Sequence, residues 1–194
     1  MNHTAHCLLS YPDEQVLIGN FIGDYVKGRV WESFAPEVQR GILLHRTIDS
    51  FTDNHPAVRA SVARIRPFAG RFSAPVVDIL YDHLLCLHWE RFAPLPFEDF
   101  AEWAYEGLNR GLDLMPAPLQ KRWPDMRAGH FLDGYRTRTG LEWVMNMFRR
   151  RLPAGLHIDA LLPFFFDEIA LFSGDFEAFF PEMQDKAKQF LTYV

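Results

Sequence analysis

Proline and glycine divide this 194-residue chain into segments of about 12 to 20 residues, and this spacing limits the folds open to it. The segments lack the sustained apolar and polar alternation, bounded by Asn-Gly or Asp-Gly turns, that is typical of strands. There is no internal repeat and no low-complexity linker. We therefore predict an all-α helical bundle, and the length, with 48% hydrophobic residues, fits one domain over 1–194.

Start and stop residues predict where the helices lie. Asp13 suits the N-cap of a helix that stops at Gly28, and Pro36 suits the first turn of a helix that ends near Asn54, before Pro56. A further helix is expected to start near Pro75. The remaining helices are expected over 57–66, 97–110, 116–138, 141–151, 158–171 and 174–194.

Composition excludes several classes of function. A net charge of −5 argues against a nucleic-acid binder, because such proteins usually carry a basic excess. Cys7 and Cys86 are too few for a disulfide framework, and the first 15 residues lack the pattern of a secretion signal. The most apolar stretch, 160–172, is interrupted by Pro163 and two acidic residues and is too short to cross a membrane. We expect a cytoplasmic protein.

Acidic and imidazole side chains interrupt three otherwise apolar predicted helices. His45 and Asp49 are one helical turn apart, Asp24 follows Asn20 by one turn, and Asp82 lies with His83 inside a strongly apolar run. A buried carboxylate needs a partner, and an arginine or a metal ion would serve. Each residue alone could be a hydrogen-bonded core or helix-end residue, but together they predict one shared site, to which His6 could also contribute.

Four ordered motifs resemble the bacterial acyl carrier protein phosphodiesterase (acyl carrier protein hydrolase) family. They are "MNHTAH" at the start, "GNFIGDYVKG" at 19–28, "HRTIDSFTDNHP" at 45–56 and "YDHLLCLHW" at 81–89. The resemblance implies a fold related to the HD-domain metal-dependent phosphohydrolases, with manganese as the metal. It also implies the reaction, hydrolysis of the phosphodiester joining 4′-phosphopantetheine to a serine of holo-acyl carrier protein. The chain lacks an adjacent His-Asp doublet, and the corresponding pair reads Asp82-His83.

A carboxylate-rich site with one or two imidazoles suits Mn²⁺ or Mg²⁺ better than Zn²⁺. We expect the metal ligands to be Asp24, His45, Asp49 and Asp82. The departing serine oxygen needs a proton, so His83 or His6 is the expected general acid. The other histidines, His3 among them, are expected to be structural.

A basic segment suggests a partner. No Asp or Glu occurs from Asn54 to Val77, whereas Arg59, Arg64 and Arg66 fall within it. Such a surface would steer an acidic acyl carrier protein towards the site, although a solvated arginine face without a partner is the simpler alternative.

Two other functions remain open. The same metal site could serve a nucleotide or another small phosphoester, or the polar clusters could belong to a non-catalytic helical binding protein. The oligomeric state cannot be read from the sequence.

Overall fold

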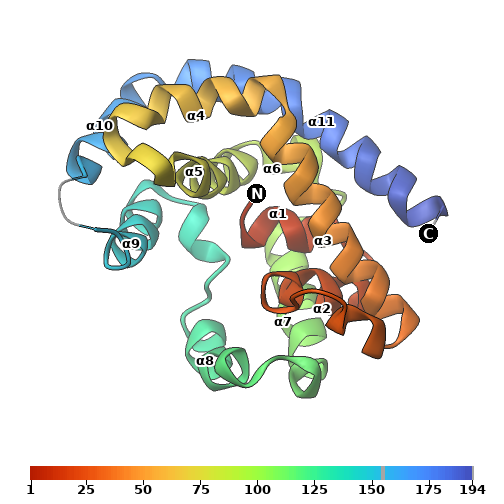
Figure 1. The fold of residues 1–194 in the computed structure, drawn as a ribbon. Coiled ribbons are helices and arrows are strands. Elements are labelled where there is room, and N and C mark those ends of the chain that lie inside the picture. The colour runs from red at the N-terminus through yellow and green to blue at the C-terminus, as the bar shows by residue number, and fades with distance from the viewer. Residues whose placement is uncertain (154–155, 194) are drawn as a thin grey trace.

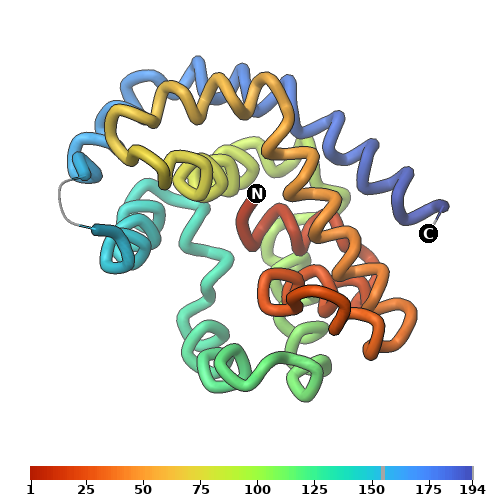
Figure 2. Tube along the Cα trace, in the orientation of Figure 1, coloured from red at the N-terminus to blue at the C-terminus, as the bar shows by residue number. Residues whose placement is uncertain are grey.

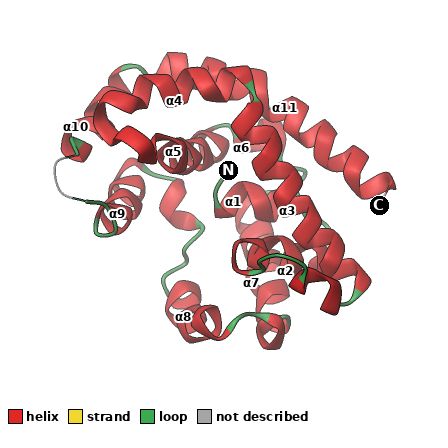
Figure 3. Ribbon diagram, in the orientation of Figure 1, coloured by secondary structure: helices red, strands yellow, loops and turns green. Residues whose placement is uncertain are grey.

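The computed structural model describes residues 1–153 and 156–193, and the regular elements within these ranges are all helical (Figure 3). The α-helices are α1 (His3–Leu8), α2 (Glu14–Ile22), α3 (Pro36–Asn54), α4 (Pro56–Ala69), α5 (Ser73–Leu87), α6 (Trp89–Phe92), α7 (Phe97–Arg110), α8 (Ala117–Ala128), α9 (Arg138–Arg149), α10 (Ile158–Asp167) and α11 (Ile169–Tyr193). Short 3₁₀ turns are η1 (Gly23–Tyr25), η2 (Val30–Ser33), η3 (Gly70–Phe72), η4 (Leu112–Leu114) and η5 (Asp133–Tyr135). The predicted all-α fold is confirmed, while its relation to HD-domain proteins stays a prediction. None of the helices described here has the length and apolar character needed to cross a membrane.

Several helix boundaries differ from the prediction. The helix expected to reach Gly28 ends at Ile22 and tightens into η1, so Asp24 lies beyond α2. The helix expected over 116–138 ends at Ala128, because the chain turns at Gly129 and at His130, which has a positive φ of 45°. The helices predicted over 158–171 and 174–194 are divided instead at Glu168, and the second of them begins at Ile169. The sequence does not predict the short helix α1, and residue 194 lies outside the described residues.

The helices form two groups, which meet at α1 and also where α3 packs against α11 and α4. In Figure 1, α4 lies between α5 and α11, whereas α3 and α7 lie on either side of α2, in agreement with the contacts between these elements. Helix α1 touches both groups, since it packs against α2 and α5. The tube in Figure 2 shows that the chain begins in the middle of the molecule, next to α3 and α5, and that α11 ends at its edge.

Helices α2 and α3 approach each other closely because glycines face each other across the contact. A Cβ atom on Gly19 would lie 2.1 Å from the carbonyl oxygen of Val38, and one on Gly41 would lie 2.2 Å from that of Val16. Real Cβ atoms never come this near to backbone, so only glycine fits at both positions. The contact sets the C-terminal half of α2 beside the N-terminal half of α3, and it brings Asn20 of α2 next to His45 of α3.

Replacement of Gly41 by alanine should therefore destabilise the protein by about 3 kcal/mol, because backbone must move to admit the methyl group. The matched control is Gly174→Ala in α11, where a Cβ would meet no atom within 4 Å. That change should stabilise the helix by about 0.5 to 1 kcal/mol. Urea unfolding of the two variants measures both effects, and equal stabilities would contradict the close packing.

Candidate metal centre

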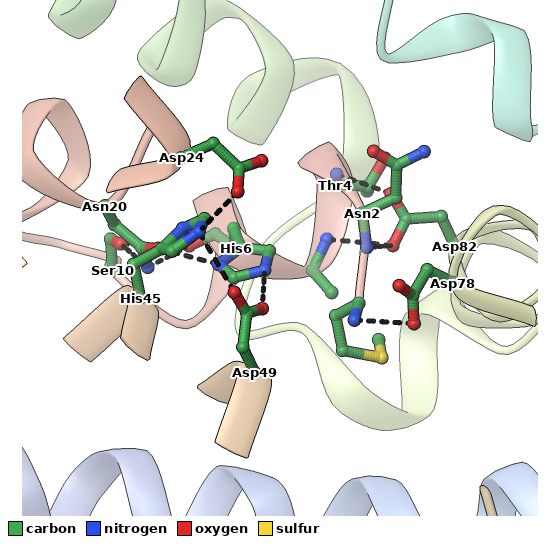
Figure 4. Close-up of polar contacts among 12 residues, drawn as sticks. Asn2, Thr4, His6, Ser10, Asn20, Asp24, His45, Asp49, Asp78 and Asp82 are labelled. Atoms are coloured by element: carbon green, nitrogen blue, oxygen red, sulfur yellow. Dashed lines mark hydrogen bonds and ion pairs between the residues drawn. The ribbon is translucent and has the colours of Figure 1, made fainter. Parts of the chain in front are cut away.

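Three segments bring two histidines and two aspartates together (Figure 4). The carboxylate of Asp49 bridges the edges of the two rings, with Oδ1 3.4 Å from Nε2 of His6 and Oδ2 3.2 Å from Nε2 of His45. Asp24 adds its Oδ1 at 3.4 Å from the same His45 nitrogen. One potential ligand atom from each of His6, His45 and Asp49 lies within 4.8 Å of the others. The structure thus gathers three of the four predicted ligands, with His6 in addition.

The cluster has a buried side and an open side. The side chains of His6 and His45 are 6% and 9% exposed, and the rings stack with their centroids 4.4 Å apart. The side chains of Asp49 and Asp24 are 44% and 75% exposed. A molecule in solution can therefore reach the cluster only from the side of the carboxylates.

Gly23 makes room for one of these rings. A Cβ atom at this position would lie 2.3 Å from Cγ of His45, inside the space that the imidazole occupies. Because Asp24 is the next residue, the 3₁₀ turn that begins at Gly23 directs its carboxylate towards the same ring. The early end of α2 and the placement of Asp24 are thus parts of one local arrangement.

The charges within the cluster stabilise one another. Burial alone would lower the pKa of His45, but the carboxylates of Asp24 and Asp49 outweigh burial and raise this pKa to about 9. His45 in turn lowers the pKa of Asp24, and the nearby rings of His45 and His6 lower that of Asp49 against the effect of burial. Burial lowers the pKa of His6. Two ionised carboxylates therefore concentrate negative charge where the histidine Nε2 atoms converge.

These residues fit a divalent cation. The Nε2 atom of His45 is buried and makes no hydrogen bond of acceptable geometry within the described residues, although two carboxylates lie near it. Such an atom, aimed at two anionic oxygens, is placed as a ligand would be. A donor set of imidazole and carboxylate groups can accommodate Mn²⁺.

Asp82, which we expected to be the fourth ligand, instead binds backbone N–H groups at the start of α1. Its carboxylate is fully buried and accepts hydrogen bonds from the backbone N–H groups of Thr4 at 2.7 Å and of Asn2 and Ala5 at 3.3 Å. It therefore caps the first turn of α1 from the neighbouring helix α5 (Figure 4). Burial raises its pKa to about 7, against the effect of these hydrogen bonds. The sequence predicts an arginine or a metal ion as the partner of this carboxylate, whereas in the structure the free N–H groups at the start of a helix serve.

His83, an expected general acid, also lies outside the cluster. Its Nδ1 is 2.7 Å from the carbonyl oxygen of Tyr135, to which it must donate, and its ring packs edge-on against Phe165 and Phe166. The other expected acid, His6, lies inside the cluster.

Two residues near the cluster were not assigned a role from the sequence. Asn20 is fully buried beside the two rings and hydrogen-bonded to His6, and in the sequence only its position on an apolar helix sets it apart. His3 packs between Phe21 and Phe131. Burial and the charge of His6 lower its pKa to about 4. No pattern in the sequence distinguished it from the other histidines.

The predicted arginine surface lies on α4, and its three arginines differ in the contacts that they make. Arg64 pairs with Asp175 of α11 and lies over the ring of Phe172. Arg59 and Arg66 are exposed, and within the described residues neither forms an ion pair. Arg59 bonds instead to the carbonyl oxygen of Asp53 and to the side chain of Asn54, at the corner between α3 and α4.

Comparison with known proteins supports the resemblance seen in the motifs. A family model described as acyl carrier protein phosphodiesterase matches residues 1–183. Proteins named acyl carrier protein phosphodiesterase from Escherichia coli O45:K1 and Escherichia coli O127:H6 are each 32% identical over 193 residues, which cover 97% of this chain and 98% of the relative. No solved structure matches the chain.

The ion pairs within the cluster make stability depend on pH when no metal is bound. Because the pKa of His45 rises from 6.5 to about 9 on folding, its pairing stabilises the fold fully below pH 6.5 and is lost as the pH rises through 9. In chelator-treated protein, the stability difference between wild type and Asp49→Asn should shrink over this range, as measured by urea unfolding. NMR titration should give a lower His45 pKa in Asp49→Asn than in wild type, and no change in the surface control Asp185→Asn. A wild-type pKa at or below 6.5 would contradict the arrangement.

Proposed function

The chain belongs to the acyl carrier protein phosphodiesterase family, and from this premise we propose that it hydrolyses the phosphodiester linking 4′-phosphopantetheine to a serine of holo-acyl carrier protein. The products would be apo-acyl carrier protein and 4′-phosphopantetheine. The proposal combines the family, which supplies the substrate and the reaction, with a cluster whose chemistry suits phosphodiester hydrolysis.

The observation that carries the proposal is the exposure of Asp49 and Asp24 at 44% and 75%. The scissile phosphorus is bonded directly to the serine oxygen of a folded protein, so the surface of that protein must come against the cluster. A rim of exposed carboxylates permits such an approach.

Two grooves of about 550 Å³ each lie along α3 and α11, and neither is lined by a residue of the cluster.

We propose Mn²⁺ as the cofactor, with Mg²⁺ as the alternative, held by His6, His45, Asp49 and Asp24. Bound there, the ion would neutralise the non-bridging phosphate oxygens and lower the pKa of a coordinated water. Asp82 is not proposed as a ligand, because its oxygens already accept hydrogen bonds from the backbone of α1.

The histidines and the carboxylates of the cluster have different roles. The stacked rings of His6 and His45 close the inner side, so the phosphodiester must approach from the outer side. There, the low pKa values of Asp24 and Asp49 keep both carboxylates ionised at neutral pH, ready to accept a hydrogen bond from the attacking water and orient it. His83 is not proposed as the proton donor, because the proton of its neutral ring lies on Nδ1 and is donated to the carbonyl oxygen of Tyr135, so that Nε2 carries none.

The decisive experiment incubates the purified protein with Mn²⁺ and holo-acyl carrier protein and weighs the carrier protein intact. We expect the loss of the phosphopantetheine mass, abolished by chelator and reduced at least about 100-fold in Asp49→Ala and His45→Ala, because each variant loses a ligand. Asp185→Asn is the surface control and should act like wild type. Hydrolysis of a small phosphodiester without any change in the carrier protein would instead support the small-phosphoester alternative, and no Mn²⁺ binding and no hydrolysis would support the binding protein.

We further propose that Arg59 and Arg66 form the docking surface for the acidic carrier protein. Arg59 lies at the corner that directly follows the helix bearing His45 and Asp49. Arg66 lies on the same helix α4, and the segment from Asn54 to Val77 contains no acidic residue. Arg64 is left out of this surface because Asp175 already neutralises it.

Reversing both charges, Arg59→Glu with Arg66→Glu, should lower kcat/KM on holo-acyl carrier protein about tenfold at low salt, because electrostatic steering is lost. The difference should shrink as salt is raised, since exposed charges are screened over about 8 to 10 Å at physiological ionic strength. Turnover of a small phosphodiester should not change. The matched control reverses the exposed Arg150 and Arg151 after α9, and a loss of equal size there would remove the case for α4.

A further inference from the structure

One buried amide, that of Asn20, contacts both histidines of the cluster (Figure 4). Its Oδ1 lies 2.7 Å from Nδ1 of His6 and 3.3 Å from Nδ1 of His45. Its Nδ2 donates to the backbone oxygen of His6 and to Oγ of Ser10, each at 2.9 Å. All four hydrogen bonds are buried, so water does not compete for them.

The acceptors around Nδ2 fix which way the amide faces. The backbone oxygen of His6 can only accept, so it must face the NH₂ group of Asn20. Ser10 confirms this orientation, because its hydroxyl proton is already donated to the same backbone oxygen at 2.9 Å and its Oγ is left to accept. The amide oxygen of Asn20 therefore faces the two rings.

An amide oxygen has no proton to give, so each Nδ1 that it bonds must carry one. We propose that Asn20 is a positioning residue that holds His6 and His45 with Nδ1 protonated, so that the Nε2 atoms of both rings are presented to one divalent cation. The role in metal binding rests on the proposed function, whereas the proton position is a property of the protein without metal.

A competing contact makes this role necessary. Asp49 lies 3.4 Å from Nε2 of His6, and in a neutral ring it would favour a proton on that nitrogen, where the cation would bind. The shorter bond of 2.7 Å to Asn20 favours the proton on Nδ1 instead. Without the Asn20 oxygen, the proton of the neutral His6 ring would lie on Nε2, which faces Asp49. This nitrogen could then no longer bind a cation. Partners of this kind, which orient metal-bound histidines, typically change metal affinity by about 10 to 100-fold.

The first test needs no variant of Asn20. In chelator-treated wild-type protein labelled with ¹⁵N at histidine, NMR at a pH above the His45 pKa of about 9, where both rings are neutral, should find a proton directly bonded to Nδ1 of both His6 and His45. The two rings are assigned from the spectra of His6→Asn and His45→Asn. A bare Nδ1 on either ring would overturn the proposal, whether or not the protein binds metal or hydrolyses a phosphodiester.

The second test separates the acceptor from the rest of the network. Asn20→Leu removes the oxygen, whereas Ser10→Ala removes only a neighbour of the amide nitrogen. Calorimetric titration with Mn²⁺ should give a dissociation constant about 10 to 100-fold weaker for Asn20→Leu and within about threefold of wild type for Ser10→Ala. Equal losses in both variants would overturn the proposal, since they would assign the effect to packing.

If Asn20→Leu does not fold, Asn20→Asp, which keeps an acceptor oxygen, takes its place, and its His6 Nδ1 must stay protonated. If the wild-type protein shows both Nδ1 protons but binds no Mn²⁺, the proposed function fails while the proton assignment stands.

Discussion

The candidate metal centre depends first on the distance between two helix backbones. At Gly19 and Gly41 the axes of α2 and α3 come so near that a single methyl group on either glycine would overlap the other helix. A wider separation, as between helices with larger side chains at the contact, would take Asn20 out of reach of His45. Glycine costs a helix about 1 kcal/mol relative to alanine, and here that cost is offset by a buried polar network that could not otherwise form.

The second requirement is the placement of α1, which is too short to be stable alone. Asp82 supplies what the short helix lacks, because it accepts three of the free N–H groups of its first turn. The buried carboxylate and the otherwise unpaired amides are each costly in isolation and satisfy one another. Since His6 lies on α1, a residue of α5 that does not touch the cluster still determines where one of its rings lies.

The sequence predicted the parts of this arrangement that follow from local periodicity. Pro36 and the His55-Pro56 pair marked α3, and the four-residue step from His45 to Asp49 follows from helical geometry. What it could not predict depends on contacts between distant segments. The N–H groups that bond to Asp82 lie 77 to 80 residues away along the chain, and no residue close to Asp82 in the sequence indicates them. His83 was similarly ambiguous, since its bond to the Tyr135 carbonyl spans 52 residues. Arg64 looked free only because its partner Asp175 is 111 residues away.

The charge at the open side of the cluster has a consequence for the order of binding. Asp24 and Asp49 line the rim, and partial burial, together with Asp78 and Asp49, raises the pKa of nearby Asp53, as expected where carboxylates crowd. An acidic carrier protein that presents a phosphodiester to this rim would be repelled by it. A divalent cation bound between the histidines and carboxylates would cancel the negative charge of Asp24 and Asp49, so under the proposed function cation and substrate each strengthen the binding of the other by the same factor. The positive charge of Arg59, beside Asp53, acts in the same direction but at the edge of the site, where salt screens it more strongly than it screens the buried cluster.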